Sequence, residues 1–147
     1  MALTQQEKQS LIDLANTARQ QAYVPYSKYR VGAALRTKTG RMFTGVNVEN
    51  AAYPHTMCAE RVAIFKAVSD GEQEFEVISV VTDNGGSPCG GCRQVLAEFG
   101  LDTIVLIANG AGQLLKEMTV QELLPEAFTP EKLSTQVDKE TRKPENK

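Results

Sequence analysis

Two runs of branched, apolar residues in the second half of the chain constrain its fold most strongly. Residues 75–82 (FEVISVVT) and residues 103–108 (TIVLIA) each have the composition of a buried strand. A helix is expected between them over residues 89–99, because Pro88 is favoured at the start of a helix and Gly100 follows its last residue. This alternation of strand and helix predicts an α/β layered domain.

The first half of the chain supplies a helix and a hairpin. Residues 4–22 carry apolar side chains at the spacing of a helix with one buried face, and Thr4 is a suitable cap. The apolar positions are Leu11, Leu14, Ala15, Ala18 and Ala22. Residues 30–35 and 42–48 have the pattern of two strands joined by a turn at residues 38–40. A sheet that begins with a hairpin and continues through crossovers is expected to be mixed.

The length of the chain determines its domain organisation. At 147 residues it can bury one substantial core but is too short for two ordinary domains. Further elements are expected at residues 58–68 (helix), 113–117 (strand) and 119–124 (helical turn). We therefore predict one domain over residues 1–130. Residues 131–147 are mostly charged and polar, and we expect them to form a disordered tail.

The charge of the chain favours small partners. The formal net charge is −2, and the charged residues are interspersed, so the sequence has no basic stripe that would neutralise nucleic-acid phosphates. No apolar run approaches the ~20 residues that a membrane-spanning helix needs. The first residues, MALTQQEKQ, are polar where a signal peptide would be apolar. We expect neither a nucleic-acid nor a membrane partner, and a cytoplasmic location.

The three cysteines predict a metal site. An odd number of cysteines cannot be fully paired within one chain. Cys58 opens one expected helix, and Cys89 and Cys92 lie in the first turn of another, so two helix N-termini could converge on one point. The positive end of a helix lowers thiol pKa values, which favours zinc binding by thiolates. Three sulfur ligands leave the fourth position open for water, as in catalytic sites, so we expect one Zn²⁺ per chain.

Glu60 follows Cys58 closely enough to face a metal-bound water without being a ligand. The motifs C-A-E at residues 58–60 and P-C-G-G-C at residues 88–92 match those of zinc deaminases. In these enzymes a metal-bound hydroxide attacks C4 of cytosine, and a glutamate transfers protons. Three thiolates would give the zinc site a net negative charge. Arg61 and Arg93 are expected to offset this charge by hydrogen bonds to ligand sulfurs, unless both are surface arginines.

Other interpretations of the cysteines remain open. A thioredoxin-like redox site would use the C-x-x-C motif but would give Cys58 and Glu60 no role. A structural zinc site would need a fourth ligand, and the only histidine in the chain is His55.

The chain resembles the small homotetrameric cytidine deaminases over a region from about Leu11 to Phe128. The matching runs are PYSKYRVGAAL (25–35), GVNVENAAY (45–53), CAER (58–61) and PCGGCRQ (88–94). The resemblance implies a three-layer α/β/α sandwich with a five-stranded mixed sheet, zinc on the three cysteines, Glu60 as proton shuttle and Arg61 as charge compensator. The activity it implies is the hydrolytic deamination of free cytidine and deoxycytidine to uridine and deoxyuridine, with release of ammonia, in pyrimidine salvage.

The same resemblance implies the substrate contacts. Asn47 and Glu49 would hold the ribose hydroxyls, unless they are merely polar turn residues, and an ionised Glu49 would repel phosphate and so select a free nucleoside. Ala51 and Tyr53 would complete the pocket of a neighbouring subunit. The remaining expected contacts are Ala59 and two aromatic residues that flank the base, Tyr29 and Phe128.

Two features depart from the family pattern. Tyr29 stands where relatives usually carry phenylalanine, so its hydroxyl needs a partner; without the resemblance, Tyr29 and Phe128 would both be interpreted as core aromatics. Residues 54–57 also differ from relatives.

Three competing functions follow from the same residues. A deaminase of a modified nucleoside, such as blasticidin, is disfavoured by the N-x-E text at residues 47–49, which suits ordinary ribose. An enzyme that edits polynucleotides would need a positively charged groove with stacked aromatics, which the acidic balance of the sequence disfavours. A noncatalytic zinc-stabilised interaction module would tolerate replacement of Glu60.

Overall fold

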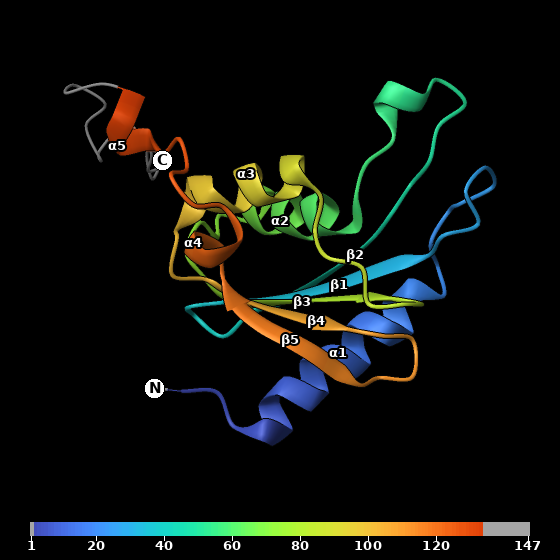
Figure 1. Cartoon of the computed structure of the whole chain (residues 1–147), viewed down its shortest axis with the longest axis horizontal. Coiled ribbons are helices and arrows are strands. Elements are labelled where there is room, and N and C mark those ends of the chain that lie inside the picture. The colour runs from blue at the N-terminus through green and yellow to red at the C-terminus, as the bar shows by residue number, and fades with distance from the viewer. Residues whose placement is uncertain (1, 134–147) are drawn as a thin grey trace.

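The computed structural model describes residues 2–133. Its centre is a five-stranded sheet with the strand order β2-β1-β3-β4-β5 (Figure 1). The strands are β1 (Val31–Thr37), β2 (Met42–Val46), β3 (Phe75–Thr82), β4 (Ile104–Ala108) and β5 (Leu114–Thr119). Strands β3 and β4 pair in parallel, and the other neighbours are antiparallel. The sheet is therefore mixed, as the sequence predicts.

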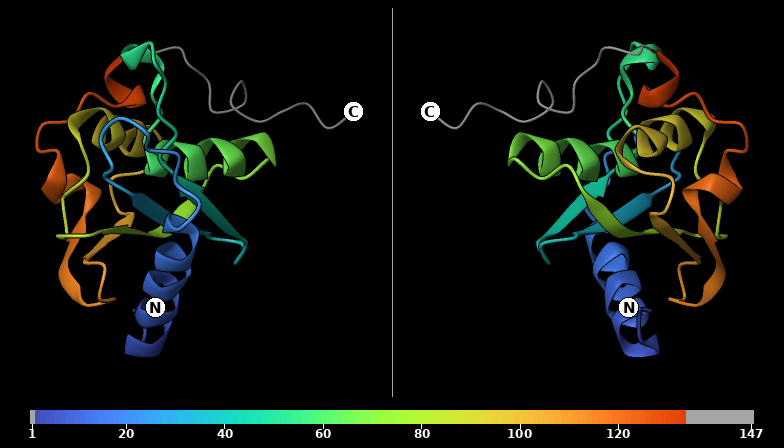
Figure 2. Two further views of the ribbon diagram at one scale, coloured as in Figure 1. Left: turned by 90° about the vertical axis from the view of Figure 1, so that its right-hand side faces the viewer. Right: turned by 90° about the vertical axis from the view of Figure 1, so that its left-hand side faces the viewer.

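Helices cover both faces of this sheet (Figures 1 and 2). Helix α1 (Gln5–Arg19) lies on one face, and helices α2 (Ala59–Ser69), α3 (Gly90–Phe99) and α4 (Val120–Leu123) lie on the other. Two short helices lie outside these layers, η1 (Tyr53–His55) and α5 (Pro130–Leu133). The prediction of a three-layer α/β/α sandwich is confirmed.

Strand β3 shows why the sequence is apolar at nearly every position there. Ile78 and Val80 belong to the core beneath α2 and α3, whereas Val77 and Val81 belong to the core beneath α1. Successive side chains of a strand point to opposite faces, so a strand covered on both sides is apolar throughout. The observed range, Phe75–Thr82, is the predicted one.

Helix α1 differs from its prediction in which face it buries. Thr4 caps it as expected, in a capping box with Glu7. However, Leu11, Ile12 and Ala15 are its buried residues, whereas Leu14 is 36% exposed, so the expected burial of Leu14 is wrong. The helix presents positions i, i+1 and i+4 to the sheet, which substitutes Ile12 for Leu14 on the buried stripe.

The end of the sheet at Thr82 gathers the segments that matter for function. Helices α2 and α3 begin there, and residues 25–30 and 47–57 project from the same end (Figure 1). Isolated bridges join Val48 to Tyr23 and to Met57, which ties these projecting segments together.

The predicted domain end and tail lie at the limit of the described chain. Helix α5 extends to Leu133, three residues past the expected domain end at residue 130, and residues 134–147 lie outside the described residues. In the part of the chain that the structure describes, every helix is too short or too polar to span a bilayer.

Candidate active site and metal centre

Two neighbouring helix starts each carry a cysteine at the N-cap. Cys58 precedes α2 and Cys89 precedes α3, and neither side chain makes a capping hydrogen bond to its helix. Helix N-caps usually have an oxygen-bearing side chain that accepts the first amide hydrogens. Here the sulfurs remain available as ligands, beside the positive ends of two helix dipoles.

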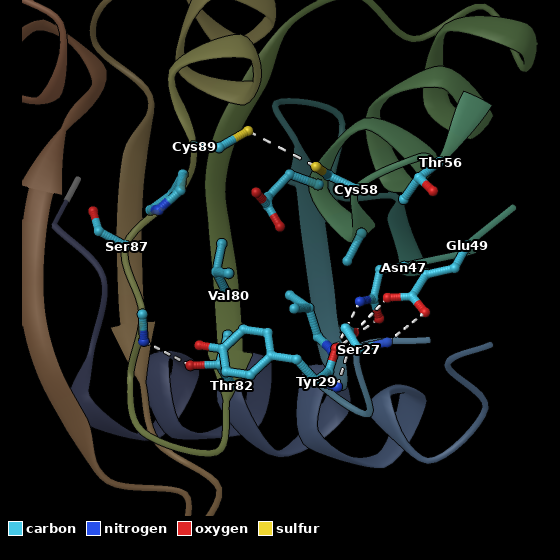
Figure 3. Close-up of a pocket in the computed structure, with 15 residues that line it drawn as sticks. Ser27, Tyr29, Asn47, Glu49, Thr56, Cys58, Val80, Thr82, Ser87 and Cys89 are labelled. Carbon is cyan, nitrogen blue, oxygen red and sulfur yellow. Dashed lines mark hydrogen bonds between the residues drawn. The ribbon is translucent and has the colours of Figure 1, made fainter. Parts of the chain in front are cut away.

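The three sulfur atoms form a cluster that fits a zinc ion. The Sγ atoms of Cys58, Cys89 and Cys92 all lie within 4.8 Å of one another, and those of Cys58 and Cys89 are 3.8 Å apart (Figure 3). Thiolates on one tetrahedral zinc, each about 2.3 Å from the metal, would be separated by about 3.8 Å. Both the spacing and the ligand type therefore fit zinc. His55 is not in this cluster, so the described residues do not support a site with three cysteines and one histidine.

Two thiols of this cluster, Cys58 and Cys92, have pKa values shifted in opposite directions. The pKa of Cys58 is lowered, chiefly by a hydrogen bond from the Cys92 thiol and further by the Arg61 guanidinium. The pKa of Cys92 is raised, because its proton is held in that same hydrogen bond and because burial disfavours its charged form. The cluster thus already favours one thiolate, which is the form that binds a metal ion.

The two arginines expected beside the cluster behave differently. Arg61 donates from Nη2 to the Cys58 sulfur at 3.2 Å, as the sequence predicts. The prediction for Arg93 is wrong, since its hydrogen bonds with described residues go elsewhere: to the carbonyls of Pro88 and Leu123 and to the Ser87 hydroxyl. The Arg93 side chain lies along the loop before α3 and reaches α4. Its hydrogen bonds therefore hold the loop that carries Cys89 against α4.

A pocket of about 290 Å³ opens beside the sulfur cluster (Figure 3). The first turn of α2 contributes Ala59 and Glu60 to its wall, and the loop before α3 contributes Pro88. Glu60 is only 4% exposed, and burial raises its pKa. The other lining residues are Ser27, Tyr29, Val31, Asn47, Glu49, Thr56, Cys58, Val80, Thr82, Gly86, Ser87 and Cys89.

A second polar group forms the opposite end of the pocket. The Glu49 carboxylate accepts hydrogen bonds from the backbone amides of Tyr26 (3.0 Å) and Ser27 (3.1 Å) and from the Ser27 hydroxyl. These donors lower the pKa of Glu49, so the carboxylate stays ionised. The Asn47 amide bonds the backbone on either side of residue 30, accepting from Val31 N (2.9 Å) and donating to Tyr29 O (2.8 Å).

Comparisons with known proteins agree with this geometry. Residues 5–108 match the family described as "Cytidine and deoxycytidylate deaminase zinc-binding region". The chain belongs to this deaminase family.

Its relatives include a protein of Sporosarcina psychrophila named cytidine deaminase, 52% identical over 129 residues, which are 86% of this chain and 94% of the relative. The crystal structure of cytidine deaminase from Burkholderia pseudomallei is 44% identical, with a TM-score of 0.78, and the match covers 86% of this chain and all of that one. Blasticidin-S deaminase of Bacillus cereus is 38% identical over 113 residues, 70% of this chain and 79% of the relative. The region matched to the deaminase family contains all three cysteines and Glu60.

Three expected contacts lie away from the pocket of their own chain. Ala51 and Tyr53 are exposed, Tyr53 to 71%, on the projecting segment, and Phe128 is 58% exposed after α4. Phe128 is held there by its carbonyl, which accepts from Gln94 Nε2 at 2.8 Å. The resemblance placed Ala51 and Tyr53 in a neighbouring subunit's pocket, and their exposure leaves them accessible to such a neighbour.

Sequence reasoning missed several residues that line the pocket. Ser27 lies within the matched PYSKYRVGAAL run, but its bond to Glu49 depends on a turn that the pattern does not reveal. Val80 and Thr82 could have been found, because they lie two residues apart at the carboxyl end of the strand β3, and ligands of α/β sheets bind at that end.

Proposed function

We propose that this protein hydrolyses the exocyclic amino group of free cytidine and deoxycytidine, giving uridine or deoxyuridine and ammonia. The observation that carries this proposal is one pocket with two chemically different ends. At one end lie the three-cysteine cluster and the buried Glu60, and at the other lies the ionised Glu49. A cytosine base at the first end would place its ribose near the second.

The three cysteine thiolates would hold the zinc ion. When bound there, zinc would supply a Lewis acid that lowers the pKa of a water molecule toward neutrality. Arg61 stabilises the negative sulfur cluster through its bond to Cys58.

Glu60 would carry the protons of the reaction. The overall change adds water across C4 of the base, breaks the bond from C4 to the exocyclic nitrogen and releases that nitrogen as ammonia. One proton from water must therefore reach the departing nitrogen. Glu60 lines the same pocket as Cys58 and Cys89, and its burial excludes bulk water that would compete for the proton.

Glu49 would select nucleosides over nucleotides. Its Oε1 already accepts from the amides of Tyr26 and Ser27, but its Oε2 accepts only from the Ser27 hydroxyl, so Oε2 can accept a further bond from a ribose hydroxyl. A phosphate beside this carboxylate would be repelled. Asn47 would contact the ribose as well, while its Oδ1 accepts from Val31 N and its Nδ2 donates to Tyr29 O.

The assembly proposed is a homotetramer with pockets shared between subunits. The exposed side chains of Ala51 and Tyr53 would then complete the pocket of a neighbour, and Phe128 would flank a base. We place the reaction in the cytoplasm, because a site made of three thiolates needs a reducing compartment.

The direct test is an ultraviolet assay of cytidine and deoxycytidine turnover on the purified protein, with and without a strong zinc chelator. We expect about one zinc per chain, turnover of both nucleosides, and loss of turnover with the chelator. Turnover of blasticidin but not of cytidine would favour the modified-nucleoside alternative and contradict this proposal.

The role of Glu60 is tested by Glu60→Ala, with Glu98→Ala on α3 as the control. Glu98 is exposed and does not line the pocket. We expect Glu60→Ala to keep its zinc and to lose at least about 100-fold in kcat, the usual contribution of a general acid-base group. Glu98→Ala should match the wild type. Full turnover by Glu60→Ala would show that another group moves the protons.

A further inference from the structure

Tyr29, which lines the pocket, makes a hydrogen bond that the sequence does not predict. Its hydroxyl donates to Asn84 Oδ1 at 2.7 Å. Tyr29 lies in the segment of residues 25–30, whereas Asn84 lies in the loop of residues 83–88 that leads from β3 to Cys89. We call this bond the Tyr29–Asn84 bridge. Asn84 is thus the hydrogen-bond partner of the Tyr29 hydroxyl, the group that phenylalanine would lack at this position.

Each end of the bridge is held by further hydrogen bonds. The Tyr29 carbonyl accepts from Asn47, and the Tyr29 amide donates to the hydroxyl of Ser27, which itself bonds Glu49. Asn84 accepts from the Thr82 hydroxyl at 3.5 Å. The bridge therefore connects the proposed ribose end to the loop that precedes a metal ligand.

The loop of residues 83–88 is held from two sides. Thr82 Oγ1 accepts from the backbone amide of Gly86 at 2.6 Å (Figure 3). On the other side, Arg93 donates to the Pro88 carbonyl and the Ser87 hydroxyl. In Figure 3 the ring of Tyr29 lies beside Thr82 and below Val80, in the pocket wall. Of the bonds described, the bridge is the one that joins this loop to the segment of residues 25–30.

We propose that the Tyr29 hydroxyl is a positioning group for the nucleoside. Its bond to Asn84 fixes the separation between the two pocket walls and so determines how the Tyr29 ring meets the base. This inference rests on the proposed deaminase function, and it extends that function by assigning the hydroxyl a role in binding rather than in proton transfer.

Gly86 provides independent steric support. A Cβ built on Gly86 would lie 2.6 Å from the Tyr29 hydroxyl oxygen, but its next neighbours, Thr82 Oγ1 and Asn84 Oδ1, are at 3.6 and 3.8 Å, which is ordinary contact. Gly86 is not among the residues with positive φ, so its backbone accepts alanine. The Tyr29 hydroxyl is thus the one close obstacle to a side chain at this position among the described residues.

The first test compares Tyr29→Phe and Asn84→Ala with the wild type in steady-state kinetics on cytidine. Each removes one hydrogen-bonding group, and we expect kcat/KM to fall about 3- to 10-fold, with more of the loss in KM than in kcat. Asn84→Asp keeps the acceptor oxygen and should stay near the wild type. The double variant Tyr29→Phe/Asn84→Ala should lose no more than either single variant, because both remove the same bond.

The second test uses Gly86→Ala in two backgrounds. In the wild type it should raise KM at least about 10-fold, because the alanine methyl displaces the Tyr29 hydroxyl and the loop. In the Tyr29→Phe background, where the obstacle is absent, Gly86→Ala should cost less than about 2-fold. A merely destabilising effect of Gly86→Ala would be equal in both backgrounds.

The outcomes separate the two proposals. Wild-type protein that does not turn over cytidine contradicts the proposed function. Wild-type turnover combined with an unchanged KM in Tyr29→Phe, or with equal losses from Gly86→Ala in both backgrounds, overturns the bridge alone. Zinc content measured for every variant excludes loss of metal as the cause.

Discussion

Gly45 on β2 lies so close to α2 that a side chain does not fit between them. A Cβ at this position would lie 2.6 Å from the amide nitrogen of Ala63 and closer still to the carbonyl oxygen of Ala59, whereas ordinary contact begins at 3.4 Å. Both obstacles are backbone atoms, which cannot rotate away. Gly45→Ala must therefore displace the start of α2 relative to the sheet by about 1 Å, because the close-packed interior has no space to absorb the methyl group.

The displaced turn is the one that carries the chemistry. It begins at Cys58 and contains Ala59 and Glu60. Overpacking of this kind costs about 1–3 kcal/mol of folding free energy, or a fall of roughly 3–10 °C in the thermal midpoint. A misplacement of about 1 Å in a catalytic group can cost about 100-fold in rate. We expect both losses in Gly45→Ala, measured by thermal unfolding and by kcat on cytidine.

Gly32 on β1 is the matched control. A Cβ there would lie 2.9 Å from the amide nitrogen of Arg19 and closer to the carbonyl oxygen of Ala15, so Gly32→Ala strains the packing of α1 on the opposite face of the sheet. It should lower the thermal midpoint by a similar amount but reduce kcat by less than about 3-fold, since α1 carries no pocket residue. Equal losses of kcat in the two variants, or no loss in Gly45→Ala, would refute the reasoning.

Two further predictions concern single side chains of the site. Glu49→Gln should raise KM for cytidine at unchanged zinc content, and it should reduce the preference for cytidine over cytidine monophosphate, measured as a ratio of kcat/KM. Hydrogen bonds from Ser27 lower the pKa of Glu49. The contribution of the Glu49 carboxylate to binding is therefore present above that lowered pKa and is lost as the pH falls through it. The KM of the wild type should accordingly stay constant down to about pH 5. Arg61→Met removes the donor to the Cys58 sulfur, and we expect about 10- to 100-fold weaker zinc binding in a competition titration with a chelator. Unchanged zinc affinity would limit Arg61 to a packing role.

The features that could be predicted from the sequence are those that depend on local pattern. Strand β3 was predicted at its full length because burial on both faces demands apolar residues at every position. Cys58 and Cys89 could be placed at helix starts because a proline, a glycine and helical spacing mark those helices nearby. The convergence of the two helix starts on one point could be expected as well, because C-A-E and P-C-x-x-C are the two halves of one zinc-binding motif in deaminases.

The features that could not be predicted depend on the direction of long side chains. Arg93 lies next to Cys92 in the sequence, yet its guanidinium donates to the Leu123 carbonyl at the end of α4 rather than to a sulfur atom. The partner of the Tyr29 hydroxyl is 55 residues away, in a loop whose path no local pattern indicates. Leu14 and Ile12 both suit the spacing of a helix, and the tilt of α1 on the sheet decides which of them is buried.

The site is divided between elements in a way that should separate metal binding from nucleoside binding. The sulfur ligands lie at the starts of α2 and α3, which pack on the sheet through the same core. The proposed ribose contacts, Asn47 and Glu49, lie outside that core and are held instead by hydrogen bonds to the segment of residues 25–30. A metal site needs ligands fixed within tenths of an ångström, and a buried core provides that rigidity. A nucleoside must enter and leave, and segments held by hydrogen bonds rather than by a packed core allow that movement. The Tyr29–Asn84 bridge lies where the two parts meet, so its loss should affect KM before it affects zinc content.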